Sequence, residues 1–195
     1  MAQKGAKAAK SKTKVRKATA HTVALVGRKK ATKTKSTLLR ASTVTASSLV
    51  EDYIGILQLL HKYCHAVDRG TADEVTALFH TEAVLLPKYE SDERYEGREA
   101  VRGWYQRYIE NFRAKVRYLR HKIEAPVIYV MGNEATCVCY LDADSITIAK
   151  NQANVACGRY DDKFIKESGQ WWFKERAIVA YYSYPLPSYR PGRGE

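Results

Sequence analysis

The change of hydrophobic repeat near residue 115 is the feature that most constrains how this chain can fold. Between residues 51 and 114, apolar side chains recur every three or four positions, which is the spacing of amphipathic helices. Beyond that point the repeat becomes two, as in strands that bury one face. Helices followed by long antiparallel strands indicate an α+β domain, in which a curved sheet carries its helices on one side.

Three helices and a short strand are expected in the first part of this domain. The first helix covers residues 51–69 and ends at Gly70, because glycine commonly terminates helices. The segment Thr71–Glu74 has the form of a capping box, so a second, short helix begins there. A strand over residues 83–89 and a third helix over residues 97–114 follow.

Four long strands complete the domain. Glycine-containing turns separate the first strand from the second and the third from the fourth, which predicts antiparallel hairpins. The four strands are expected near residues 116–130, 134–149, 153–167 and 170–182.

The net charge of +12 belongs to the N-terminal segment alone. Residues 1–50 contain 13 Lys or Arg and no Asp or Glu, which leaves 20 of the 33 basic residues against all 21 acidic ones in the rest of the chain. A lysine-rich segment without aromatic residues cannot bury enough apolar surface to fold. We therefore predict a disordered basic tail over residues 1–49, a domain over residues 50–186 and a C-terminal extension over residues 187–195.

The basic tail has four interpretations. A solvated tail and an upstream extension without a function are the simplest. Binding of nucleic acid is an alternative, because lysine-rich arms release counterions from phosphates. An organelle transit peptide is another, although such peptides favour arginine over lysine.

The sequence predicts an intracellular, cytoplasmic protein, with organelle targeting by the tail as the alternative. No run of apolar residues is long enough to span a membrane, and no segment resembles a secretory signal. The four cysteines, which fit no zinc-ribbon spacing, are interpreted as reduced thiols: Cys64, Cys137, Cys139 and Cys157.

Asp68 and His121 are polar residues that the hydrophobic pattern places on apolar faces. On the first helix, Asp68 lies four residues after Cys64 and eight after Leu60, so it falls on the buried stripe. On the first long strand, His121 shares the apolar face with Ile123. A buried carboxylate is costly without a partner, and a carboxylate that orients an imidazole produces a general base. The alternatives are that Asp68 merely ends its helix in solvent and that His121 is a satisfied core histidine.

Two further polar residues border these faces. Tyr63 lies three residues after Leu60, beside the same stripe. Arg176 shares a strand face with Ile178, and an inward arginine needs an anion or a polarised oxygen, which a substrate can supply. The alternative is a surface arginine paired with Glu175 or with an acid on a neighbouring strand.

A metal site at His61, Cys64 and His65 is disfavoured. Compact zinc sites of this kind usually add a second, distant ligand pair, and the sequence offers none. A phosphate-binding loop and a nucleophile elbow are also missing from the sequence. We therefore expect no metal and no cofactor.

The order and spacing of five motifs resemble the SnoaL-like families of the nuclear-transport-factor-two-like superfamily. The motifs are AVDRG at the end of the first helix, ALFHTEAVL, GREAVRGW, RHKI and the closing GQWWFKERAIVAYYSYPL. The resemblance covers roughly residues 51–186. It implies a cone-shaped α+β barrel of mostly antiparallel strands with three N-terminal helices, and homotrimers or homodimers.

Within that superfamily, the chain is similar to small cofactor-free lyases such as scytalone dehydratase, the bile-acid 7α-dehydratases and hexachlorocyclohexane dehydrochlorinase. The resemblance implies a catalytic dyad of Asp68 and His121, and substrate-binding roles for Tyr63, Tyr89 and Arg176. The dehydrochlorinase has a lysine in place of Tyr63, so this departure favours a hydroxyl donor over dehalogenation.

We therefore expect a cofactor-independent lyase that carries out a dehydratase-type elimination on a cyclic, largely apolar small molecule. An isomerase with the same residues and a non-catalytic binding or structural module are the alternatives. The expected partners are the substrate and further copies of the chain, with no membrane.

Overall fold

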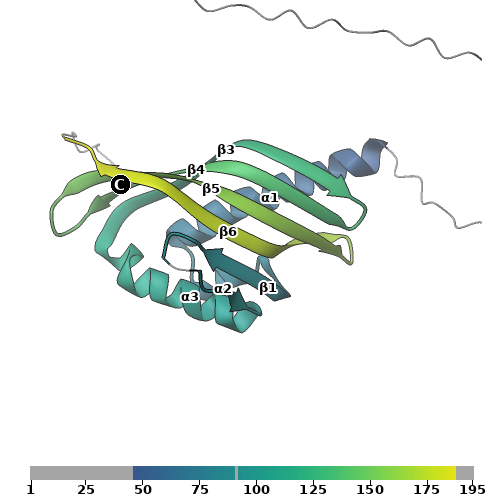
Figure 1. Cartoon of the computed structure of the whole chain (residues 1–195), viewed down its shortest axis with the longest axis horizontal. Helices are drawn as coiled ribbons and strands as arrows, with labels where there is room; N and C mark the ends of the chain where they lie inside the picture. Colours follow the sequence, from purple (N-terminus) through teal and green to yellow (C-terminus); the bar gives the residue numbers. More distant parts are fainter. Residues whose placement is uncertain (1–45, 91, 188–195) are drawn as a thin grey trace, which may run out of the picture. The chain divides into compact units, whose positions relative to one another are not determined.

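The computed structural model describes residues 46–90 and 92–187 (Figure 1). Its helices are α1 (Ala46–Arg69), α2 (Ala72–Thr76), α3 (Arg98–Asn111) and the 3-10 turn η1 (Arg113–Lys115). Its strands are β1 (Phe79–Pro87), β2 (Tyr95–Glu96), β3 (Val116–Met131), β4 (Glu134–Thr147), β5 (Gln152–Glu167) and β6 (Gln170–Pro185). No helix in this part of the chain is long and apolar enough to cross a membrane.

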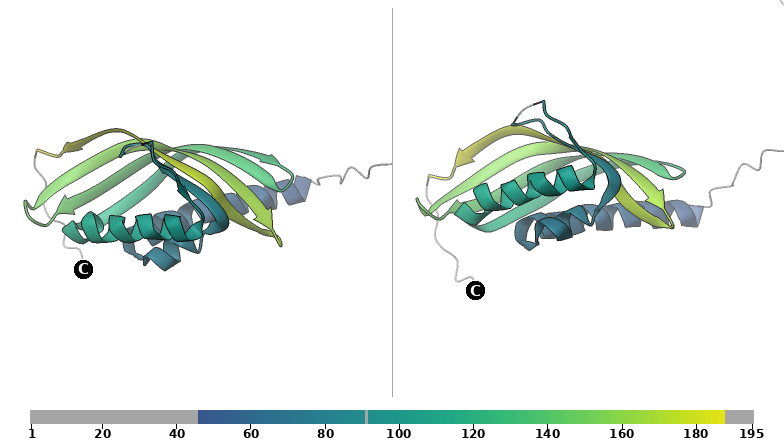
Figure 2. Two further views of the ribbon diagram at one scale, coloured as in Figure 1. Left: turned by 60° about the horizontal axis from the view of Figure 1, so that its bottom comes forward. Right: turned by 90° about the horizontal axis from the view of Figure 1, so that it is seen from below.

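The strands form one curved sheet in the order β2-β1-β6-β5-β4-β3. All neighbours are antiparallel except β1 and β6, which run parallel. The helices lie together on one face of the sheet (Figure 2). The domain is thus α+β, as the change of repeat predicts.

The sheet does not close into the cone-shaped barrel that the resemblance implies. Strands β2 and β3 lie at its two edges and do not pair with each other. Strand β2 has two residues and pairs only with β1, so it offers no ladder to β3. Helix α1 packs against β3, so a helix rather than a strand covers this part of the sheet.

The predicted long strands are confirmed within a few residues, but the first half of the domain differs in detail. Helix α1 reaches back to Ala46, into the segment predicted to be disordered. Helix α2 ends at Thr76, and β1 begins at Phe79, earlier than expected. The rest of the predicted basic tail and nearly all of the C-terminal extension lie outside the described residues.

Two local devices fix the end of α1. Position 70 requires glycine, because a Cβ atom there would lie only 2.8 Å from the carbonyl oxygen of Ala66. Arg113 donates from Nη1 to the carbonyl oxygens of Val67 and Gly70, at 3.2 and 2.6 Å. These bonds satisfy helix-end carbonyls that otherwise lack partners. They hold the last turn of α1, which carries Asp68, against the start of β3.

Two irregularities in β3 determine which way its side chains point. The backbone is left-handed at Tyr118 and Ala125, with φ of 54° and 48°, and the register with β4 shifts at both places. Such bulges bend a strand and re-aim its side chains. Between them, His121 pairs with Ala143, and it projects toward the helices.

The core lies between α1, α3 and the inner face of the sheet. It includes Ile56, Leu60, Phe79, Leu85, Tyr105 and Phe173, all of which are at least 99% buried. Each such side chain stabilises the fold by roughly 1.5–3 kcal/mol.

Removal of residues 1–45 is expected to leave the melting temperature of the domain unchanged within a few degrees, because this segment is rich in lysine and has no aromatic residue and no apolar repeat. Thermal unfolding of the full-length and shortened chains, followed by circular dichroism, measures the difference. A larger decrease would show that the N-terminal segment packs on the domain.

Candidate functional site

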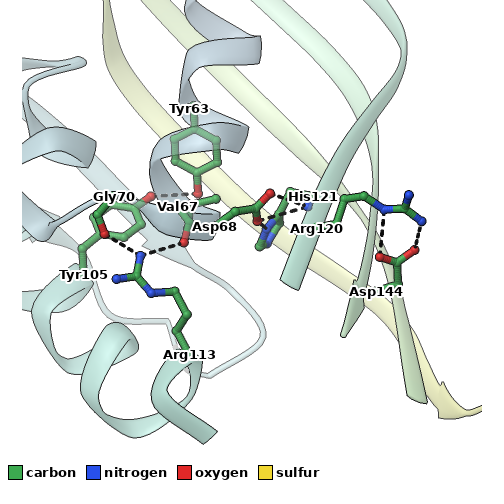
Figure 3. A network of polar contacts seen from close by, with 9 residues as sticks. All are labelled: Tyr63, Val67, Asp68, Gly70, Tyr105, Arg113, Arg120, His121 and Asp144. Carbon is green, nitrogen blue, oxygen red and sulfur yellow. Dashed lines mark hydrogen bonds and ion pairs between the residues drawn. The ribbon is translucent and has the colours of Figure 1, made fainter. Parts of the chain in front are cut away.

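Asp68 at the end of α1 and His121 on β3 lie in direct contact (Figure 3). The Nδ1 atom of His121 is 2.6 Å from Oδ1 of Asp68. The backbone N–H of His121 also donates to both carboxylate oxygens, each at 3.1 Å. The contact expected from the hydrophobic pattern is therefore present, and it fixes the backbone as well as the ring.

This geometry determines which nitrogen of His121 faces outward. Because a carboxylate accepts hydrogen bonds, it favours the tautomer with the proton on Nδ1. Nε2 then carries the lone pair, and His121 lines a cavity. The side chains of Asp68 and His121 are 5% and 10% exposed, so bulk water screens the pair weakly.

The cavity has a volume of about 650 Å³ and lies between α1, α3 and the sheet. Its wall is largely aromatic around His121, with Tyr63, Tyr89, Trp104, Tyr105, Tyr108 and Phe112. Among the residues that the structure describes, the ionisable lining residues are Glu90, His121, Cys157 and several tyrosines, and none is a lysine or an arginine. It thus suits an apolar, uncharged molecule.

Tyr63 lines this cavity and is held by Tyr105. The hydroxyl of Tyr105 donates to that of Tyr63 at 2.9 Å, and both side chains are buried. Burial raises the pKa of Tyr63, although the nearby charge of Arg176 opposes the increase. Both phenols therefore keep their protons at neutral pH, and Tyr63 has its own proton to donate.

Arg176 is buried behind Tyr63 and has a protein partner. Its Nε and Nη2 atoms donate to the carboxylate of Asp162 at 2.8 and 2.7 Å. Its guanidinium carbon lies 3.9 Å from the ring centre of Tyr63 and 4.1 Å from those of Tyr160 and Phe173. Arg176 is not among the cavity-lining residues, so the structure places it in contact with Tyr63 rather than in the cavity.

The partner of Arg176 is a residue that our sequence analysis missed. A signal was present, because Asp161 and Asp162 are consecutive in a strand, and one of the two must face inward. Only the pairing register, which sets Asp162 opposite Arg176, identifies which. The arginine thus takes the acid on a neighbouring strand, but buried rather than at the surface.

Tyr89 and an aromatic ladder on α3 line the cavity together. Tyr89 follows β1 and is 44% exposed. On α3, Trp104 stacks on Tyr108 at 5.5 Å, and Tyr108 contacts Phe112 at 5.2 Å. The sequence indicates this ladder, because its three aromatic residues recur every four positions on one helix. It does not indicate that the ladder lines a cavity. Nε1 of Trp104 donates to Glu90 at 3.1 Å, which ties the ladder to the loop after β1.

The described residues contain no cluster of three or more His, Cys, Asp or Glu that could hold a metal. Of the three residues considered as metal ligands, His61 and His65 are exposed and Cys64 is buried. Burial raises the pKa of Cys64 to about 11, so it is a thiol at neutral pH.

The SnoaL-like domain family model matches residues 48–177. A search of curated proteins finds no match. Among solved structures, the chain is similar to a candidate scytalone dehydratase from Novosphingobium aromaticivorans DSM 12444, with a TM-score of 0.62 and 22% identity over 77% of this chain and 100% of that one.

Two further structures show the same fold. A type 3 hexachlorocyclohexane dehydrochlorinase from Novosphingobium barchaimii LL02 has a TM-score of 0.63 and 14% identity, over 76% of this chain and 100% of that one. A candidate aromatic ring hydroxylase from Novosphingobium aromaticivorans has a TM-score of 0.59 and 19% identity, over 70% and 94%. At these identities the likeness establishes the fold and not the activity.

Replacing Arg176 with methionine is expected to destabilise the domain by about 3–5 kcal/mol, because Asp162 would keep a buried charge without a partner. Urea unfolding measures the change. Lys163→Met is the matched control: Lys163 pairs with Glu175 in the adjacent register position but is 60% exposed, so its loss costs at most about 1 kcal/mol. Equal effects of the two substitutions would contradict the assignment of Arg176 to a buried pair.

Proposed function

This chain belongs to the SnoaL-like domain family, and we propose that it is a cofactor-independent lyase that carries out a dehydratase-type elimination on a cyclic, largely apolar small molecule. The observation that carries the proposal is the contact between Asp68 and His121 at the wall of an aromatic cavity. The lack of lysine and arginine among the described lining residues supports an uncharged substrate.

In the proposed reaction, Nε2 of His121 removes a proton from a carbon next to a carbonyl group. Asp68 holds the ring through Nδ1 and stabilises the imidazolium that forms. The electron pair of the broken C–H bond forms a C=C bond, and the C–O bond of a neighbouring hydroxyl breaks with its electrons on oxygen. That oxygen takes up the proton that Nε2 of His121 removed, which restores the neutral ring. The products are an unsaturated ketone and water, and no further reactant is needed.

Tyr63 supplies the proposed hydrogen bond to the substrate carbonyl. Its hydroxyl accepts from Tyr105 and keeps its own proton for donation to the oxygen, where negative charge develops. Arg176 acts on the substrate through Tyr63. Its positive charge stabilises negative charge on the phenol oxygen, which makes the hydroxyl of Tyr63 a stronger hydrogen-bond donor. Tyr89, a partly exposed lining residue, contacts the body of the substrate.

Replacement of the base tests the proposal. A panel of alicyclic hydroxy-ketones and steroid-like alcohols is screened for loss of water by mass spectrometry and for absorbance of the conjugated product. His121→Ala is expected to lower kcat by about 10²–10⁴-fold, the usual contribution of general acid–base catalysis. His65→Ala, which removes an exposed histidine from α1, is the control and keeps full activity.

Two nearly isosteric substitutions test the roles of the supporting groups. Asp68→Asn is expected to lower kcat more than it raises KM, because it removes the charge that stabilises the imidazolium. Tyr63→Phe is expected to lower kcat less than His121→Ala or Asp68→Asn does, since it removes one hydrogen-bond donor and no charge. If His121→Ala and Asp68→Asn both keep full activity, the pair is structural and the proposed mechanism is wrong. If no compound of the panel loses water, a binding module replaces the lyase.

A further inference from the structure

We propose that the end of the cavity remote from Tyr63 is a second polar subsite, formed by Ser145, Asn154 and Ser183, which binds an oxygen function of the substrate. The inference rests on the proposed function, because it names the substrate class of the same cavity. That class is an uncharged polycyclic molecule with an oxygen function at each end and an apolar body between them.

The pairing register places these three residues away from His121 on the same face of the sheet. His121 pairs with Ala143 on β4, and Ser145 lies two residues further along that strand. Asn154 on β5 is the direct partner of Ser145. All of them line the cavity, as does Ser183 on β6.

The separation suits a fused-ring molecule. Neighbouring strands are about 4.8 Å apart and each residue advances a strand by about 3.4 Å, so the Cα atoms of His121 and Asn154 are roughly 12 Å apart. By the same reasoning, Ser145 is roughly 8 Å from His121. A single ring that contacts His121 would not reach Asn154.

The polar groups of this subsite have capacity for a ligand. Nδ2 of Asn154 donates to the carbonyl oxygen of Gln152 at 2.8 Å, which orients the amide and leaves its oxygen as an acceptor. Within residues 46–90 and 92–187, the hydroxyls of Ser145 and Ser183 have no hydrogen-bond partner. The subsite therefore offers both donors and an acceptor, as an alcohol or a phenol requires.

The residues between the two polar ends are apolar, and two of the four are alanines. Leu141, Ala143, Ile178 and Ala180 line this middle part of the cavity. Short side chains leave room for a rigid ring system and offer it no polar contact. Because no lysine or arginine of residues 46–90 and 92–187 lines the cavity, these residues give a carboxylate or a phosphate on the substrate no compensation for lost hydration.

Equilibrium binding of two rigid probes tests the subsite. Estradiol carries a hydroxyl at each end of a fused-ring body, and its analogue without the alcoholic hydroxyl carries only one. The wild-type chain is expected to bind estradiol about three- to tenfold more tightly, the effect of one net hydrogen bond. Isothermal titration calorimetry measures both dissociation constants without turnover.

The double variant Ser145→Ala/Asn154→Ala is expected to lose this preference, with the two dissociation constants within twofold of each other. Thr147→Val is the matched control, because Thr147 lines the same end but donates its hydroxyl to Gln152 at 3.2 Å, and the preference should persist. If the double variant melts at a lower temperature, Ser183→Ala replaces it in the test, because Ser183 is at an exposed position. This variant is expected to lose part of the preference.

The proposal is overturned if the wild type binds neither probe or both equally, or if the double variant keeps the full preference. Failure of the proposed function has a different signature. In that case the diol preference depends on Ser145 and Asn154, but no compound loses water in a reaction that depends on His121.

Discussion

The carboxylate of Asp68 is the group on which the arrangement of this domain most depends. It is nearly excluded from water and lies at the C-terminal end of α1, where the helix dipole disfavours a negative charge. The backbone N–H and the ring of His121 offset that cost. Arg113 donates hydrogen bonds to the adjacent helix-end carbonyl oxygens. The same bonds attach the first helix to the edge strand β3, so the fold and the candidate site share one interaction.

A comparison of two buried carboxylates explains why the chemistry is assigned to one of them. Asp162 is satisfied by Arg176 inside the core, and that pair is enclosed by aromatic rings. Asp68 is satisfied by a histidine that lines the cavity, and only one of its two ring nitrogens contacts the carboxylate. The first pair shapes the wall of the site through Tyr63, whereas the second presents a titratable atom to a ligand. The two pairs therefore support different roles despite similar burial.

The helical stripe and the strand alternation were sufficient to predict that Asp68 and His121 face inward, because each depends on a local repeat. They also predicted the long hairpins. Closure of the sheet could not be predicted, since it depends on whether two edges meet, and β2 is too short to show a repeat. The bulges at Tyr118 and Ala125 were equally invisible, because neither position carries a glycine. The place of Arg176 was missed for a similar reason: its partner is set by the register between strands rather than by its neighbours in sequence.

The central claim is that Asp68 holds the proton of His121 on Nδ1 and leaves Nε2 as the base in the cavity. Nitrogen-15 NMR of the histidine ring measures this directly, because protonated and unprotonated ring nitrogens have well separated chemical shifts. The account predicts that the neutral form of the His121 ring carries its proton on Nδ1, and that Asp68→Asn loses this tautomer preference. A neutral ring protonated on Nε2, with Asp68 intact, would contradict it.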